Sequence, residues 1–274
     1  MNFVLNARRA LSPFYAMSEL LWYVNREQSV ERLVEYAPQY KNFAEADGNA
    51  YGAYGHRIGH NVPGRDQLDL VVHTLRSQPS SRQCVVSLWR PDDLVHAYTL
   101  DKKDLPCTLT WQFILRSNGL HMIANMRSND AWLGLPYDAY VNTCFMGMIA
   151  QELGVPMLTY THQAGSMHLY DKNLEAAEES LRVPTFALPN NYMGLWKQQE
   201  LRKLAAIEQD ARRFNLYPEP FAASAPTCDM WHVIEHWHDM KTSGSLSVRN
   251  VFHSPALAKG MELYADHRRS RLGG

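Results

Sequence analysis

The sequence has almost no net charge, few cysteines and no long apolar run. Among its 274 residues, 27 Lys and Arg nearly balance 28 Asp and Glu, which gives a net charge of −1. A broad basic surface for nucleic acid is therefore not expected, and any anion site must be built from a few placed arginines. The four cysteines follow no paired or metal-like spacing, which is typical of a reducing compartment; they are Cys84, Cys107, Cys144 and Cys228. Because neither a secretory leader nor an apolar stretch of about 18 residues is recognisable, we expect a cytoplasmic protein with no membrane partner and no stable nucleic-acid partner.

Hydrophobic periodicity divides the chain into a mixed α/β body and a mainly helical C-terminal part. Helical spacing predicts helices at residues 14–24, 29–40, 66–76, 139–153, 174–182 and 195–214. Runs of β-branched and aromatic residues predict strands at residues 83–89, 109–115, 121–126, 157–163 and 166–170. The turn Ser117-Asn118-Gly119 joins two of these strands as a hairpin, because Asn-Gly supports a positive φ. Glycines between residues 48 and 64 indicate an irregular loop.

Cys107 is the candidate nucleophile that the residues themselves suggest. It lies in Asp104-Leu105-Pro106-Cys107-Thr108, directly before a predicted strand. A thiolate is a capable nucleophile only where a positive group lowers its pKa, and Arg127 at the end of the facing strand could do so. Free cysteine is also a common small core residue. Composition and spacing leave both interpretations open.

Several segments, in the same order and with similar spacing, resemble the thymidylate synthase superfamily. They are Glu19-Leu20-Leu21-Trp22-Tyr23, Tyr54-Gly55, Pro79-Ser80-Ser81-Arg82, Pro106-Cys107, Arg127-Ser128-Asn129-Asp130, Leu133-Gly134-Leu135-Pro136-Tyr137 and His168-Leu169-Tyr170. The resemblance implies an α/β (α+β) fold with a thymidylate synthase-like mixed β-sheet packed with helices. It implies a catalytic core at residues 1–173, and residues 174–274 would form a helical C-terminal extension packed on that core. It also implies a homodimer.

The resemblance assigns a chemical role to each matched segment. The Cys107 thiolate would add to C6 of a pyrimidine nucleoside monophosphate, and C5 would then take a one-carbon unit from 5,10-methylenetetrahydrofolate. Glu19 would manage protons through ordered water, and Tyr54 would assist loss of the C5 proton. The expected nucleotide-binding residues are Arg127 and Ser128, Arg82 acting in trans from the partner subunit, and the sugar-binding His168 and Tyr170. The residues expected to line the folate site are Asp130, Leu133, Gly134 and Tyr137.

Two departures from the synthase pattern bear on the base and the product. Synthases carry His after the nucleophile and Asn after the Leu-Gly-Leu-Pro segment, where this chain has Thr108 and Asp138. Both changes resemble the phage deoxycytidylate hydroxymethylases and the cytidylate hydroxymethylases of nucleoside-antibiotic pathways. A carboxyl group accepts from cytosine N4 and shares a proton with N3, whereas an Asn amide suits uracil. Asp138 is therefore predicted to read the base as part of the catalytic site, although it could also be the N-cap of the helix that follows.

These departures predict C5 hydroxymethylation of dCMP or CMP. The alternatives are a methylase acting on dUMP, UMP or dCMP, and a non-catalytic relative that binds nucleotide or RNA. Retention of the thiol favours an enzyme, because a pure binding protein does not need it.

Some features fall outside the family pattern. Gln83 replaces the second arginine of the trans pair, and the upstream phosphate loop is not matched, which leaves Arg8 or Arg9 to replace its arginine. His232-Val233-Ile234-Glu235-His236 fits the zinc pattern H-x-x-E-H, but no third carboxylate ligand can be assigned. A packing helix with Trp231 and Trp237 explains that segment better, so we expect no metal ion.

Overall fold

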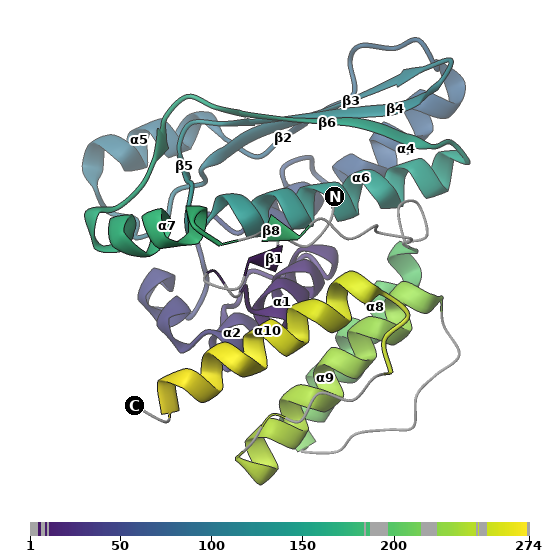
Figure 1. The fold of residues 1–274 in the computed structure, drawn as a ribbon. Helices are drawn as coiled ribbons and strands as arrows, with labels where there is room; N and C mark the ends of the chain where they lie inside the picture. The colour runs from purple at the N-terminus through teal and green to yellow at the C-terminus, as the bar shows by residue number, and fades with distance from the viewer. Residues whose placement is uncertain are drawn as a thin grey trace.

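The fold of the chain is seen in a computed structural model that describes residues 5–6, 9, 11–183, 185–186, 197–214, 224–244, 246 and 251–272 (Figure 1). Its helices are α1 (Pro13–Val24), α2 (Glu31–Tyr36), α3 (Tyr54–His60), α4 (Gln67–Ser77), α5 (Pro91–Thr99), α6 (Leu135–Leu153), α7 (Leu174–Leu181), α8 (Gln198–Phe214), α9 (Ala225–Ser243) and α10 (Pro255–Leu272), with 3-10 turns η1 (Pro38–Phe43) and η2 (Asp171–Asn173). Its strands are β1 (Leu5–Asn6), β2 (Val85–Ser87), β3 (Thr108–Arg116), β4 (Gly119–Met126), β5 (Asn129–Asp130), β6 (Met157–Ala164), β7 (Met167–His168) and β8 (Thr185–Phe186).

The main sheet has the order β2-β3-β4-β6 and is mixed, as the sequence predicts. β3 pairs antiparallel with β2 and β4, whereas β4 and β6 are parallel and are connected through α6. Beyond β4 and β6 the short strands β5 and β7 pair in parallel, which places Asp130 opposite His168. The sheet therefore brings the end of β4 and the end of β6 to one edge.

One face of the sheet is buried and the other is open. Trp111, Phe113 and Met122 are fully buried and alternate with half-exposed neighbours, because successive strand side chains point to opposite faces. The buried face packs on α6, and the opposite face is covered by no element of the described residues (Figure 1). Val85 and Leu158 are 47% and 39% exposed. The open face is thus partly apolar.

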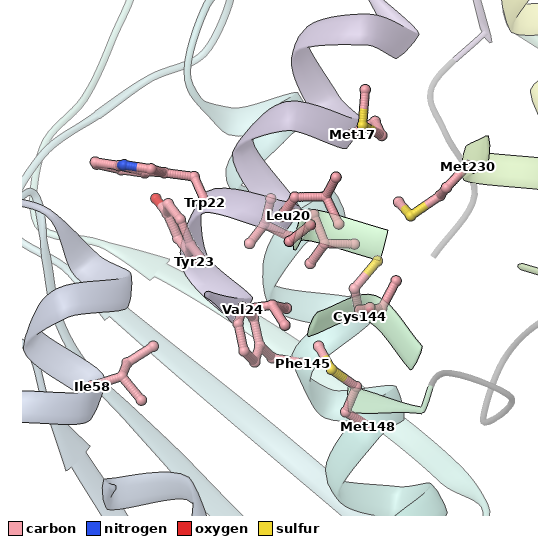
Figure 2. Close-up of a cluster of buried hydrophobic side chains, with 14 of the residues drawn as sticks. Met17, Leu20, Trp22, Tyr23, Val24, Ile58, Cys144, Phe145, Met148 and Met230 are labelled. Atoms are coloured by element: carbon pink, nitrogen blue, oxygen red, sulfur yellow. The ribbon is translucent and has the colours of Figure 1, made fainter. Parts of the chain in front are cut away.

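Helix α1 lies at the centre of the molecule. The Ser12 side chain caps it by accepting from the Tyr15 amide at 3.2 Å, and Pro13 occupies its first turn. All of its residues except Tyr15 are buried, so the helix has no solvent-facing stripe. It packs against α6 on one side and against the C-terminal helices on the other (Figures 1 and 2). Burial of each large apolar side chain in this way contributes about 1.5–3 kcal/mol to the free energy of unfolding.

A single hydrophobic cluster joins the α/β body to the C-terminal helices α8, α9 and α10. In Figure 2, Met17 of α1 lies on the side of Met230 of α9, and Phe145 of α6 lies next to Val24 at the other end of α1. Trp237 of α9 has its ring 5.0 Å from that of Phe14. The division between a core at residues 1–173 and an extension at residues 174–274 stays a prediction. No helix among the described residues combines the length and apolarity needed to cross a membrane.

The structure corrects several sequence-based boundaries. The helix predicted at residues 29–40 is two short elements, α2 and η1, because Pro38 lacks the amide hydrogen that would continue α2. The hairpin forms, but its turn residues are Ser117 and Asn118, and only Gly119 has a positive φ, of 140°. A Cβ atom on Gly119 would lie 2.5 Å from the carbonyl oxygen of Pro156, which explains the glycine.

Helix α6 begins earlier than its periodicity predicts. It starts at Leu135 rather than Ala139, because Pro136 is tolerated in a first turn. The N-cap position belongs to Gly134, and Asp138 lies inside the helix. The N-cap alternative for Asp138 is therefore wrong.

Candidate active site

Cys107 lies where β3 begins and β4 ends. The pairing of Thr108 with Met126 sets Arg127 beside it, and the Arg127 amide donates to the Cys107 carbonyl oxygen at 2.8 Å. The amides of Cys107 and Thr108 both donate to the Tyr54 hydroxyl, at 2.9 and 3.0 Å. The structure thus brings the expected nucleophile together with the two residues expected to act beside it.

Arg127 holds the loop that carries the nucleophile. Its Nε and Nη2 atoms donate to the carbonyl oxygens of Pro106 and Leu105, at 3.0 and 3.1 Å. Burial raises the pKa of the Cys107 thiol; the Arg127 charge acts against this shift, and Asp138 and Asp104 add to it. Arg127 does lower the pKa of the Cys107 thiol, as the sequence predicts. The pKa is nevertheless raised overall, because the effect of burial is larger than that of Arg127.

Glu19, which is buried, and Asp138, which is half-buried, form a pair of carboxyl groups that we call the carboxyl pair. Glu19 accepts from the Tyr15 hydroxyl at 2.8 Å, and its Oε2 atom has no hydrogen-bond partner in the described part of the chain. Burial and the charge of Asp138 raise the pKa of Glu19 to about 8, and burial raises the pKa of Asp138 to about 6. Near pH 7, one group therefore holds a proton while the other is ionised, which places an acid and a base in one site.

Asn129 and Tyr15 are site residues to which sequence reasoning gave no role. Asn129 is buried, and its Nδ2 atom donates to Asp138 Oδ2 at 2.6 Å. Strand alternation could have suggested this, because Asn129 points away from its neighbours Ser128 and Asp130. Tyr15 lies four residues before Glu19 on one helix, so helical spacing places the two side chains together.

The residues expected at the phosphate and sugar lie together in part. Ser128 Oγ is 3.4 Å from His168 Nδ1, and the ring of Tyr170 meets that of His168 edge-on at 5.1 Å. Arg82 lies elsewhere: its carbonyl oxygen accepts from Gln112, which is roughly 16 Å along the strand direction from Cys107. The trans role of Arg82 stays a prediction, since one chain does not place it at its own Cys107.

A cavity of about 1120 Å³ opens beside the carboxyl pair. Most of the residues expected at folate line it: Leu133, Gly134 and Tyr137. Asp130 instead shapes the loop, because its Oδ1 atom accepts from the amides of Trp132 and Leu133 at 2.7 and 3.0 Å.

Arg9 lies at this cavity, where its guanidinium donates to the Trp132 carbonyl oxygen at 2.9 Å and lies 5.0 Å from the centre of that indole ring. These contacts differ from those expected of a phosphate arginine beside Arg127. Arg8 falls outside the described residues.

The histidines of the H-x-x-E-H segment have other contacts on α9. His236 is buried, with Nδ1 2.6 Å from the His232 carbonyl oxygen and its ring 5.3 Å from Phe252. His232 Nδ1 lies 2.7 Å from Glu235. Across the described residues, no three His, Cys, Asp or Glu side chains are grouped to hold a metal ion. Together with the buried Trp231, these contacts describe a packing helix.

Comparisons with known proteins agree with this geometry. The family model for thymidylate synthase matches residues 2–218. Thymidylate synthase 1 of Bacillus spizizenii is 29% identical over 195 residues, which are 68% of this chain and 66% of that protein. Thymidylate synthase of Buchnera aphidicola is 31% identical over 176 residues, which are 62% of this chain and 65% of that protein.

A solved structure, thermostable thymidylate synthase A from Bacillus subtilis, aligns with a TM-score of 0.59 and 26% identity over 69% of each chain. The chain spans slightly less than two thirds of the synthases of Bacillus spizizenii and Buchnera aphidicola. Helices α9 and α10 lie beyond the family match. Because that match covers well over half of the sequence, the chain belongs to the thymidylate synthase family.

Proposed function

We propose that this protein is a one-carbon transferase that modifies C5 of a pyrimidine nucleoside monophosphate, with 5,10-methylenetetrahydrofolate as co-substrate and no metal ion. The observation that carries the proposal is the assembly of Cys107, Tyr54 and Arg127, with Asp138 close enough to act on the thiol and lining a cavity together with Glu19. A protein that only binds a nucleotide or RNA would need neither a thiol held in this way nor a proton donor and acceptor beside it.

The residues suggest a sequence of proton and bond movements. Cys107 loses its proton and its sulfur adds to C6 of the base, which makes C5 a carbon nucleophile. The folate co-substrate supplies the one-carbon unit that C5 takes up. Tyr54, held at the Cys107 amide, assists removal of the C5 proton, and Glu19, protonated near pH 7, manages protons at the base. Elimination of the thiolate restores Cys107.

Residues around Cys107 also supply sites for the rest of the nucleotide. Arg127 and Ser128 follow β4 next to Cys107, and His168 lies next to Ser128 and contacts the Tyr170 ring. An arginine fork matches the geometry of a phosphate group. We assign the phosphate and sugar contacts to these side chains.

The cavity also fits the folate co-substrate. It is as large as the larger small-molecule sites of proteins, and aromatic rings of Trp132 and Tyr137 line it next to Glu19 and Asp138. These features suit a planar heterocycle that carries several donors and acceptors.

The base we assign is cytosine, in dCMP or CMP. Asp138 occupies the position of the uracil-reading Asn, and Asn129 fixes its Oδ2 atom by a hydrogen bond of 2.6 Å. A carboxyl group with a pKa of about 6 can accept from cytosine N4 and exchange a proton with N3 near neutral pH. An Asn–cytosine or Asp–uracil mismatch leaves a polar group unpaired, at a cost of roughly 1–3 kcal/mol.

The product we assign is the 5-hydroxymethyl nucleotide. Thr108 replaces the synthase His directly after the nucleophile and is fully buried, and Asp104 and Ser166 also depart from the synthase pattern. These changes admit water to the exocyclic methylene on C5 before a hydride reduces it. A methylated product remains the alternative outcome within the same chemistry.

The protein is proposed to act as a cytoplasmic homodimer. The open face of the sheet carries half-exposed apolar residues such as Val85 and Leu158, and Arg82 lies too far from its own Cys107 to bind the same nucleotide. A partner packed on that face would bring its Arg82 toward this site. A fully active monomer at nanomolar concentration would contradict this assembly.

The deciding experiment combines substrate choice with product mass. The protein is incubated with labelled 5,10-methylenetetrahydrofolate and each of CMP, dCMP, UMP and dUMP. We expect a cytidylate to gain a CH2O unit with tetrahydrofolate as coproduct; a gain of CH2 with dihydrofolate would show a methylase. Cys107→Ala should abolish tritium release from C5, and the control Cys84→Ala, in the core, should retain it. Appreciable release by Cys107→Ala would rule out the covalent mechanism.

A further inference from the structure

Helix α10, which lies outside the family match, is packed directly against the candidate active site. Its Tyr264 ring meets Phe14 of α1 edge-on at 5.4 Å. Its Leu263 belongs to the cluster that contains Leu11, Ala16 and Tyr137. The buried residues Met261 and Ala265 complete this contact surface. One side of α10 is therefore fixed against α1 and against a residue expected at the co-substrate.

The next turn of α10 reaches the cavity. His267 and Arg268 follow Leu263 and Tyr264 by four residues, so each lies above an anchored residue on the same helix face. Both side chains are half-buried and line the cavity of about 1120 Å³ that also contains Glu19 and Asp138. The wall supplied by α10 thus carries one permanent positive charge and one titratable group.

The acidic and the basic residues that line this cavity belong to different parts of its wall. Its acidic members are the carboxyl pair, Glu19 and Asp138, whereas its basic members are Arg9, Lys172, His267 and Arg268. An anionic ligand group is repelled by the carboxyl pair and attracted to the basic residues. A co-substrate with one uncharged end and one acidic end therefore has a preferred orientation here.

The adjacent Arg269 shows that position, rather than composition, distinguishes Arg268. Basic residues near a helix C-terminus complement the helix dipole wherever they point. Arg269 is exposed and pairs with Asp266 at 2.5 Å on the same helix, and it is not among the residues that line the cavity. Arg268 has the same charge and lies at the same helix end, but it lines the cavity.

We propose that α10 is part of the co-substrate site and that Arg268, assisted by His267, binds the carboxylates of the glutamate tail of the folate. This inference rests on the proposed function. A guanidinium binds a carboxylate through two parallel hydrogen bonds, which suits an acidic tail better than a point charge does. The pterin end then lies toward Glu19 and Asp138, and the tail lies along α10.

Equilibrium binding measures this without turnover. Tetrahydrofolate with one glutamate, tetrahydrofolate with five glutamates, and tetrahydropteroate without glutamate are titrated into the whole protein in the presence of dCMP. Arg268→Ala should weaken binding of both glutamylated ligands by about tenfold, as expected for one charge-assisted pair, and should leave tetrahydropteroate nearly unchanged. Arg268→Lys should recover part of the loss, and the matched control Arg269→Ala should bind all three ligands like the parent protein.

Two results would overturn the inference. One is equal weakening of all three ligands by Arg268→Ala, which would indicate a change of cavity shape; the other is no weakening of any. Added salt should weaken glutamate-dependent binding in the parent protein and have less effect on Arg268→Ala. If the parent protein binds dCMP but none of the folates, the proposed function fails as well. If the parent protein binds the folates and Arg268→Ala changes their affinity by the same factor with and without glutamate, only the proposed role of α10 fails.

Discussion

Two groups of charged side chains, both with members in or next to α1 and α2, are built in contrasting ways. The first, which we call the docking ion cluster, consists of Glu27, Arg32, Glu208 and Arg212, and it joins α2 to α8. Arg32 and Glu208 are fully buried and in direct contact, and Arg212 adds a bond of 2.6 Å to Glu208. The second group is the carboxyl pair, Glu19 and Asp138, which has no cation bonded to either member in the described residues.

The docking ion cluster stabilises the fold, whereas the carboxyl pair has properties suited to catalysis. In the docking ion cluster each buried charge meets an opposite charge or a donor, such as the Tyr36 hydroxyl at 2.9 Å from Glu208. Such pairing offsets the cost of desolvation. The carboxyl pair lacks that compensation, so burial raises both of its pKa values toward neutrality. Groups with pKa values near 7 are the ones that exchange protons during catalysis.

The largest expected effect comes from breaking the docking ion cluster. Glu208→Ala leaves Arg32 buried and without its main counter-charge, which should lower the free energy of unfolding by about 3–5 kcal/mol. Urea denaturation measures this. The control is Glu31→Ala, which removes the 79% exposed partner of Arg212 and should cost under about 1 kcal/mol. Equal losses for the two variants would show that burial does not decide the contribution.

Replacing the Asp138 carboxyl group by an amide should change which base the enzyme prefers and leave the fold intact. Asp138→Asn should shift the ratio of kcat/KM values toward dUMP over dCMP by about 10- to 100-fold, as roughly 1–3 kcal/mol of mispaired polar group implies. Kinetics with both nucleotides measure the ratio. An unchanged ratio, or a preference of the parent protein for dUMP, would refute the assignment of cytosine to Asp138.

Replacing Glu19, the other member of the carboxyl pair, by Gln should change how the free energy of unfolding depends on pH. The raised pKa of Glu19 means that the folded state holds this proton more tightly than the unfolded chain does. Its contribution to stability is complete below the unfolded pKa of about 4.5 and is lost as the pH rises toward about 8. Glu19→Gln should remove this loss and be more stable than the parent by roughly 1–3 kcal/mol at pH 8. Unfolding measured from pH 5 to 8 tests it; the exposed Glu31→Gln should keep the parent's slope.

The smallest effect compares one tyrosine hydroxyl in each group. The Tyr15 hydroxyl favours the charged form of Glu19, so Tyr15→Phe should raise the pKa of Glu19 further, by up to about one unit for a hydrogen bond of roughly 0.5–1.5 kcal/mol. The pH profile of kcat should therefore shift to higher pH by a similar amount. Tyr36→Phe removes a similar bond to Glu208 and should lower stability by about 1 kcal/mol. A shift of the pH profile by Tyr36→Phe would show that the two groups are coupled.

Much of the fold follows from periodicity, and the exceptions have physical reasons. Strands β3 and β4 bury alternate side chains and α4 buries one face, which local patterns predict well. Helix α5 gives no such signal, because its Leu94 and Tyr98 are 69% and 88% exposed. The sequence analysis predicted neither helix α10 nor its contribution to the wall of the cavity.

The sequence by itself determined which chemical groups the protein possesses and how they are ordered. A thiol after a proline, an arginine at the end of the facing strand and a carboxyl in place of an amide are all fixed by residue identity, and neighbouring residues specify their strands and helices. Only the tertiary structure decided how these groups behave. The pKa of Glu19 depends on burial and on Asp138, more than a hundred positions along the chain, and Asp138 is held by Asn129 across a turn. Desolvation and charge interactions depend on distance in space, which local sequence patterns do not record.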